Sequence, residues 1–560
     1  MTMTDPMDEL YGVFCVIVAM VVFACAAIGC KTYKNYKKRS TDLADLVEVK
    51  IPMDELAGPR GFPIIGALHQ LSDSGGPFEA FTRLSQMYGE MYAIQLGSAK
   101  CVVVSNIALA KEVLITRGFD FGGRPDFLRF HSLFGGDRNN SLALCDWSSL
   151  QKRRRSIARV FCFPRQGGNH MTALSDVSIQ EMNSCLDYLC KESTRPIIEG
   201  REPFKPIIMR TIANIFTNYM CSMSFGYDDA KFNEIVTTFD KIFWDINQGY
   251  ALDFLPWLKP FYKKHLDTLN DWASTIRSFL LERIINKKYE KLQNGGKPSD
   301  FTETLLEHHL SPESDLTWEH IMFELEDFIG GHSAVGNLLT MIFVYLAKNP
   351  EAQRKIYDEV ERLKFGKRQR EDYVVSLYDR EELPYTEAVM WETLRMSSSP
   401  IVPHVAITDT SLGNCTIDKG TCVFINNYEL NLGTSYWGDD AREFKPERFI
   451  RSVKDERGNS KDCPVKPAHF LPFSTGKRTC IGQRLVQSIS FVFLSNFVWK
   501  YELQVPDGQD PMDYVQPSCV ALPPECFNLK FVERHPSRKV PAAKSPQENE
   551  TPVELSSSVR

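Results

Sequence analysis

The segment FLPFSTGKRTCIGQRL, residues 470–485, constrains the fold of this chain more than any other. A cysteine, Cys480, lies between two glycines, Gly476 and Gly482, which let a loop close tightly around its sulfur. The cation Arg478 favours a thiolate over a thiol, and so does the dipole of the helix whose periodicity begins after the loop. The segment therefore predicts an anionic sulfur at the start of a helix, which is a setting for a metal ligand.

Two other interpretations of the segment were open. A lone cysteine among the 15 in the chain is usually a buried apolar thiol. The fragment TGKRT is similar to a phosphate-binding loop, but Leu471 stands at the position of the first glycine of that motif and Arg478 replaces its Ser or Thr. The phosphate-loop interpretation is therefore rejected.

Residues 12–30 form an uncharged apolar run near the N-terminus. At 1.5 Å per residue the run is about 28 Å long, close to the thickness of a bilayer core. Five basic residues follow it within residues 31–39, which predicts a cytosolic location for the rest of the chain. A cleaved signal peptide, the alternative, carries its basic residues before a shorter apolar core. We expect a membrane anchor in residues 1–30 and a basic stop-transfer segment and linker in residues 31–56.

Residues 57–534 predict one large, mainly α-helical domain with small β-sheets. Prolines and glycines in residues 57–71 predict a stiff turn, and the polar tail, residues 535–560, is expected to be disordered. A net charge of -6 argues against a nucleic-acid partner. Three runs predict strands: Met91–Gly97, Cys101–Ser105 and Thr421–Asn427.

The stretch DFIGGHSAVGN interrupts an otherwise continuous helical pattern at residues 317–348. Its glycines Gly330, Gly331 and Gly336 each cost a helix about 0.5 to 1 kcal/mol relative to alanine. A helix tolerates that loss where a flat ligand or another backbone must come close, so we expect such a group against this helix.

Residues Phe473, Gly476, Arg478, Cys480 and Gly482 match F-x-x-G-x-R-x-C-x-G, and by this motif the chain resembles the cytochrome P450 superfamily. The resemblance implies the mainly α fold of that family with small β-sheets. It also implies a b-type heme, iron protoporphyrin IX, whose iron is bound by the Cys480 thiolate. Electrons are then expected from NADPH through a flavoprotein reductase.

Two further motifs agree with the resemblance. Glu392 and Arg395 in WETLR match the family's E-x-x-R, and Arg448 in FKPERF is expected to complete a buried network with them. An exposed salt bridge between residues i and i+3 would explain WETLR by itself.

In the resembled fold the helix with the glycines crosses the distal face of the heme. The family pattern A-G-x-[DE]-[TS] then corresponds to Gly330, Gly331, His332, Ser333 and Ala334, so the usual acid and alcohol are absent. His332 or Ser333 is a candidate for moving protons, since histidine has a suitable pKa. A core histidine with a satisfied hydrogen bond is the alternative.

The heme propionates require cations or donors. The resemblance assigns Arg478, His404 and Trp147 to them, with Lys152 as a weaker candidate, because Gln151 stands where the family has an arginine. A basic surface for an acidic NADPH-cytochrome reductase is expected on the proximal side. Its members are the run Lys152–Arg155 together with Lys466, Lys477 and Arg484.

More narrowly, the altered distal helix and FKPERF resemble the Spook and Spookier family of insect ecdysteroid-synthesis enzymes. The resemblance implies a sterol substrate and an early step from 7-dehydrocholesterol, in the endoplasmic reticulum membrane with a single anchor. The aromatic-rich residues 119–134 and 243–258 are expected to line the substrate pocket and touch the membrane, or to be core. Two alternatives stay open: an isomerase or dehydratase that needs no external electrons, and a heme-binding sensor.

Overall fold

The structure, a computed structural model, describes residues 50–72, 76–367, 373–454, 460–516 and 519–534. The chain divides into two compact units, Met1–Lys50 and Ile51–Arg560, and the second contains the whole fold described below. The predicted membrane span at residues 12–30, most of the linker and the C-terminal tail lie outside the described residues.

Helices form most of the described unit. In chain order they are α2 (Pro77–Tyr88), α3 (Ile107–Lys111), α4 (Leu128–Leu133), α5 (Ser149–Cys162), α6 (Asn169–Leu189), α7 (Arg195–Ile198), α8 (Lys205–Cys221), α9 (Ala230–Ile246), α10 (Lys263–Leu280), α11 (Asn286–Gln293), α12 (Phe301–Leu310), α13 (Trp318–Lys348), α14 (Pro350–Gly366), α15 (Pro384–Ser397), α16 (Asn427–Leu432), α17 (Thr434–Trp437) and α18 (Gln483–Lys500).

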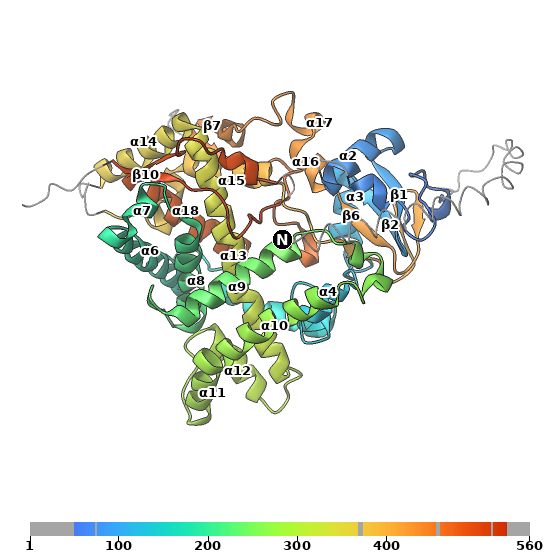
Figure 1. Cartoon of the computed structure of the whole chain (residues 1–560), viewed down its shortest axis with the longest axis horizontal. Coiled ribbons are helices and arrows are strands. Elements are labelled where there is room, and N and C mark those ends of the chain that lie inside the picture. The colour runs from blue at the N-terminus through green and yellow to red at the C-terminus, as the bar shows by residue number, and fades with distance from the viewer. Residues whose placement is uncertain (1–49, 73–75, 368–372, 455–459, 517–518, 535–560) are drawn as a thin grey trace, which may run out of the picture. The chain divides into compact units, whose positions relative to one another are not determined.

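Helix α13 is the central element, and it packs against α8, α9, α10, α12, α15 and α18 (Figure 1). It confirms the helix predicted at residues 317–348. Thr317 caps its start, because the Thr317 hydroxyl accepts a hydrogen bond from the backbone N–H of His320. Of the helices described, only α13 has the length and apolar character to cross a membrane, but 83% of its most apolar window is buried within the protein. It is therefore a core helix of this fold.

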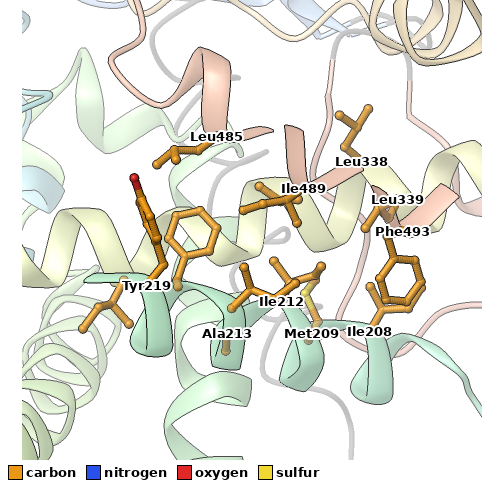
Figure 2. Close-up of a cluster of buried hydrophobic side chains, with 14 of the residues drawn as sticks. Ile208, Met209, Ile212, Ala213, Tyr219, Leu338, Leu339, Leu485, Ile489 and Phe493 are labelled. Carbon is orange, nitrogen blue, oxygen red and sulfur yellow. The ribbon is translucent and has the colours of Figure 1, made fainter. Parts of the chain in front are cut away.

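Glycine at position 336 lets α8 and α13 approach closely. A Cβ atom on Gly336 would lie 2.4 Å from the Sδ atom of Met209, a side chain of α8. Apolar side chains of α18 complete the same core layer. Figure 2 shows this layer with Ile208, Met209, Ile212, Ala213 and Tyr219 of α8, Leu338 and Leu339 of α13, and Leu485, Ile489 and Phe493 of α18.

A four-stranded sheet in the order β1-β2-β6-β3 lies beside this helical core (Figure 1). Strands β1 (Met91–Leu96) and β2 (Ala99–Val104) are antiparallel, whereas β2 pairs in parallel with β6 (Cys422–Ile425), which pairs antiparallel with β3 (His404–Val405). The three predicted strands are thus confirmed as β1, β2 and β6. Three two-stranded sheets complete the set: β4 (Thr410–Leu412) with β5 (Cys415–Ile417), β7 (Ile450–Lys454) with β8 (Ser460–Pro464), and β9 (Tyr501–Gln504) with β10 (Lys530–Glu533).

Candidate functional site

The loop that precedes α18 is held in place by glycine. Gly476 has a φ of +75°, and a Cβ atom there would lie 1.9 Å from the carbonyl oxygen of Leu114 in the short π-helix η3 (Glu112–Thr116). Only glycine fits both conditions. The loop then closes on itself, because the Cys480 N–H donates a hydrogen bond to the Phe473 carbonyl at 2.9 Å. The sequence motif thus fixes where the Cys480 side chain lies.

Cys480 lies in surroundings that act on the pKa of its thiol in opposite directions. Its side chain is solvent-accessible, yet the surrounding protein raises the pKa of its thiol. Hydrogen bonds from the backbone N–H groups of Gly482 and Gln483, at the start of α18, and the charge of Arg155 lower that pKa and stabilise the thiolate. Arg155 also donates a hydrogen bond to the carbonyl of Thr479, the residue before the cysteine.

Two buried arginines, Arg124 and Arg478, meet at one backbone carbonyl. Arg478 donates to the carbonyl of Ala143 at 2.9 Å and to the side-chain oxygen of Gln151 at 2.7 Å, while Nε of Arg124 donates to the same Ala143 carbonyl at 3.3 Å. Burial, and next the charge of Arg478, lower the pKa of the Arg124 guanidinium well below its usual range; burial also lowers the pKa of Arg478, to about 10. Neither guanidinium forms a salt bridge with a carboxylate of the described residues.

His404 lies beside the two arginines. It is fully buried in β3, and its Nδ1 is 2.8 Å from the carbonyl of Phe121, whereas its Nε2 has no hydrogen-bond partner. Burial and the charge of Arg124 lower the pKa of His404 well below its usual range. Two unpaired buried cations and an unpartnered ring nitrogen require an anionic group. The two propionates of a heme satisfy that requirement, so the residues present fit the cofactor.

The other two propionate candidates differ in placement. Trp147 lies two residues before α5 and is half-buried, and its backbone N–H donates to the carbonyl of Gly122 at 3.1 Å. Lys152 is exposed on α5. The buried Gln151, at the position of the family's arginine, instead holds Arg478 and donates to the Leu142 carbonyl at 2.9 Å.

One face of α13 is only partly buried in the middle of the core. Within residues 323–346, all of which the structure describes, only Asp327, Gly330, Gly331 and Ala334 are not buried. These positions are spaced i, i+3, i+4 and i+7, so they share one face of the helix. We call these four residues the open face of α13. From Gly330 to Ala334, about one turn, this face carries no side chain larger than a methyl group, which leaves a flat strip for a planar ligand.

Aromatic rings border the two glycines of this face. Cβ atoms at Gly330 and Gly331 would lie 3.0 Å from the ring of Phe239 and 3.3 Å from the ring of Phe216, respectively. Part of the reason for glycine is therefore close packing with α9 and α8, which the sequence reading did not anticipate.

His332 and Ser333 lie away from the open face. Both are fully buried, and His332 Nδ1 is 2.6 Å from the carbonyl of Ile329 while its ring packs edge-on against Phe239. Burial lowers the pKa of His332 to about 4. This corrects the expectation that His332 has a pKa suited to proton transfer, because desolvation disfavours its charged form. The geometry agrees with a core histidine.

Glu392, Arg395 and Arg448 form a buried network. The Glu392 carboxylate accepts from Nε of Arg395 at 2.7 Å and from Nε of Arg448 at 3.1 Å, and the side chains of Glu392 and Arg395 are fully buried. Arg395 also donates to the backbone carbonyl of Asn431 at 2.8 Å. These contacts differ from the exposed salt bridge that the motif alone would allow.

The basic run on α5 divides between core and surface. Arg154 is buried and its Nε lies 2.9 Å from Glu324 of α13. This corrects the expectation that Arg154 belongs to a basic surface. Arg153 pairs with Asp315. Lys466 likewise differs from the expectation, because it is partly buried over the ring of Trp391 and burial lowers its pKa to about 8.

We call four cations of this region the basic cluster: Lys152, Arg155 and Arg159 of α5 with Arg484 of α18. Another expected member, Lys477, is exposed and lies 5.2 Å from the ring centroid of Phe119. Arg159 and Arg484 both lie 5.5 Å from the ring centroid of Phe163. Lys152, Arg159 and Arg484 are exposed. The cluster lies beside the Cys480 loop through the Arg155–Thr479 contact.

Three site residues were missed in the sequence. Arg124 lies in the aromatic-rich residues 119–134, whose rings predict a pocket lining or core. The isolated arginine after two glycines was the available signal for a site residue. Arg155 was counted as one of a surface run. Asp327 is the first residue of the glycine stretch, and the sequence interpretation considered only the glycines and the residues that follow them.

Comparison with known proteins gives a consistent result. The family model for cytochrome P450 matches residues 56–531. Cytochrome P450 307a1 of Drosophila melanogaster is 44% identical over 495 residues, which cover 85% of this chain and 89% of the relative. Steroid 17-alpha-hydroxylase/17,20 lyase of Ictalurus punctatus is 28% identical, with 85% of this chain and 91% of the relative covered. A zebra fish cytochrome P450 structure with progesterone has a TM-score of 0.66 at 26% identity, covering 82% of this chain and 99% of that one.

Proposed function

The chain belongs to the cytochrome P450 family and is a heme-dependent monooxygenase supplied with electrons by a reductase; we propose that it oxidises a sterol in an early step of ecdysteroid synthesis from 7-dehydrocholesterol. The observation that carries the sterol proposal is similarity over most of the chain to a steroid hydroxylase, combined with the flat open face of α13. The ecdysteroid step rests on the narrower resemblance to the Spook and Spookier family.

The residues described above divide the work of holding the cofactor. Cys480 would bind the iron, and Arg124, Arg478 and His404 would receive the propionates, with Trp147 as a further candidate. When bound, the thiolate-ligated heme activates dioxygen so that one oxygen atom enters the substrate. Burial raises the pKa of the Cys480 thiol, and the N–H groups at the start of α18 act against it by lowering that pKa and favouring the thiolate.

The substrate class follows from the shape of the open face. Gly330, Gly331 and Ala334 have no side chain larger than a methyl group. A rigid, planar, apolar ring system would therefore lie against them without strain. The aromatic segments expected to line the pocket contact each other, since Phe127 packs edge-on against Phe254 at 5.4 Å between ring centroids. A sterol satisfies both the flatness and the apolar surroundings.

An exposed apolar patch supports attachment to a membrane. Phe62, Ile64, Trp257 and Phe261 are each 50% or more exposed. Their segments are adjacent, because the turn after β1 hydrogen bonds to both: the Gly97 N–H donates to the carbonyl of Ile65 and the next N–H to that of Phe254. Apolar side chains gathered at one point favour an apolar partner. We propose that this patch and the anchor at residues 12–30 hold the enzyme on the endoplasmic reticulum, with the domain in the cytosol.

Reconstitution tests the proposal directly. Purified protein loaded with heme is combined with NADPH, a flavoprotein reductase and a panel of sterols that includes 7-dehydrocholesterol, and the products are identified by mass. We expect 7-dehydrocholesterol to be converted only when NADPH is present. Product formed without NADPH would indicate an isomerase, and oxidation of non-sterol substrates in preference to every sterol would contradict the proposed substrate class.

A further inference from the structure

Asp327 is the only titratable residue on the open face of α13, since the other three members are Gly330, Gly331 and Ala334. It lies seven residues before Ala334, about 10 Å along the helix axis. A row of two or three hydrogen-bonded waters, or a polar group of the substrate, would have to bridge that distance. The chain therefore places a carboxyl group on the same strip of helix that faces the ligand, two turns from where the family carries its alcohol.

The contacts of Asp327 leave one of its oxygens available. Oδ2 accepts hydrogen bonds from the Leu142 N–H at 2.5 Å and the Ser141 hydroxyl at 3.1 Å. Oδ1 has one long contact, 3.3 Å, with the same hydroxyl. The next carbonyl along this loop, that of Ala143, receives Arg124 and Arg478. The carboxyl and the propionate-binding cations are thus fixed to one loop.

The surroundings of Asp327 bring the pKa of its carboxyl group close to neutral pH. The charged groups that interact with it electrostatically are Arg154 of α5, the neighbouring acids Glu324 and Glu326 of α13, and the thiol of Cys145. Burial is the largest effect and raises the pKa of Asp327 to about 6, against the hydrogen bonds and Arg154, which lower it. Both protonation states are therefore populated under physiological conditions.

The usual proton-delivering groups are replaced or turned away. Ala334 has no hydroxyl, and Ser333 is fully buried next to His332, which is neutral near pH 7. Delivery of protons to dioxygen still needs a group that holds a proton and faces the ligand.

We propose that the Asp327 carboxyl takes protons from water and passes them along the open face to the distal side of the heme, in place of the acid that the family carries at the position of Ser333. This inference rests on the proposed monooxygenase function. One C–H bond of the substrate, dioxygen, NADPH and one proton give an alcohol, water and NADP⁺. The carboxyl gives up one proton at a time and regains it from water, so it is unchanged overall.

The variant Asp327→Asn removes the proton but keeps an oxygen that accepts from Leu142. Its matched control is Glu326→Gln, the adjacent acid, which is buried and points away from the open face toward Arg277. In the heme-loaded, reductase-supplied enzyme we expect Asp327→Asn to form about tenfold less product per NADPH, because general acid catalysis is worth at least that factor. The lost electrons appear as peroxide, from dioxygen, NADPH and one proton. Glu326→Gln should stay within about twofold of the wild type.

The pH profile separates this role from a structural one. The carboxyl holds its proton below its pKa and loses it above, so coupling in the wild type should fall as the pH rises through about 6. Asp327→Asn should remove that dependence, and Asp327→Glu, which restores a carboxyl, should recover it. A variant that only disturbed the loop would lower coupling equally at every pH.

A second readout needs no turnover. The infrared difference spectrum between low and high pH should contain a protonated-carboxyl band with a midpoint near pH 6 that Asp327→Asn abolishes and Glu326→Gln retains. Absence of that band, or unchanged coupling in Asp327→Asn, would overturn the inference. Without sterol, dioxygen is released as peroxide or is reduced to two waters by two NADPH and two protons. The peroxide yield in that reaction therefore measures proton delivery without any substrate. Failure on every sterol therefore counts against the proposed substrate and leaves the test of Asp327 intact.

Discussion

Glu392 is one anion shared by two buried arginines, Arg395 and Arg448. Removing one partner of a buried ion pair leaves an uncompensated charge in a medium that solvates it poorly. The network also holds backbone carbonyls, because Arg395 donates to those of Asn431 and Ala441. A single carboxylate therefore fixes several segments that are distant in the sequence.

We predict that Glu392→Gln lowers the free energy of unfolding by about 3 to 5 kcal/mol, because both guanidinium groups lose their counterion. Urea denaturation of the heme-loaded protein measures the change. The control is Glu282→Gln, which breaks the exposed pair with Lys231 and should cost less than about 1 kcal/mol. Equal effects of the two substitutions would show that the buried network contributes no more than a surface pair.

At the residue scale, the sequence predicts the role of residues that a short motif defines. It does not predict the burial or partners of residues whose contacts lie far along the chain. Cys480 and the Glu392–Arg395 spacing are visible within ten residues. Arg154 looked like one of four surface cations, because its partner Glu324 lies 170 positions away and nothing local marks it. The burial of His332 is likewise set by Phe239 of another helix.

At the scale of elements, the cysteine loop depends on its contact with η3. Gly476 has no room for a side chain, because the Leu114 carbonyl occupies the position of a Cβ atom. The obstacle is backbone, which cannot rotate away as a flexible side chain can.

We predict that Gly476→Ala displaces the loop and removes most of the bound heme, measured as the heme-to-protein absorbance ratio. The matched control is Gly508→Ala, which has a similar φ of +81° but nothing within 4 Å. It should cost only about 1 kcal/mol of backbone strain and keep its heme. Full heme content in Gly476→Ala would mean that the loop tolerates the displacement.

Elements with strong periodicity were predictable in both type and position. The helix expected at residues 317–348 is α13, and the three expected strands differ from β1, β2 and β6 by no more than two residues at either end. Which face of α13 stays open was not predictable, because that depends on the packing of α8 and α9 around it. The glycines signalled a close approach but did not say whether a ligand or an aromatic ring makes it.

At the scale of the whole molecule, the basic cluster lies beside the Cys480 loop, and the resemblance to the family implies that the open face of α13 is on the distal side of the heme. Electrons and substrate would then reach the heme from opposite sides. The cluster lies on α5 and α18, and its cations Lys152, Arg159 and Arg484 are exposed.

We predict that Arg159→Glu combined with Arg484→Glu raises the KM for the reductase about tenfold at low ionic strength, because like charges then oppose docking. The effect should shrink as salt rises and shortens the Debye length to below about 8 Å. Lys419→Glu, an exposed charge between β5 and β6, is the control and should change nothing. A KM unaffected by the double reversal at low salt would place the reductase elsewhere.

The proposed monooxygenase function depends most directly on Cys480 as the ligand of the heme iron. The ferrous protein with carbon monoxide tests this, because only a thiolate opposite the carbon monoxide produces the strongly red-shifted Soret band of this family. The control is Cys162→Ala, which removes the buried thiol whose pKa is raised by burial and next by the charge of Cys480. We predict the shifted band in the wild type and in Cys162→Ala and its loss in Cys480→His. A shifted band in Cys480→His would contradict the assignment.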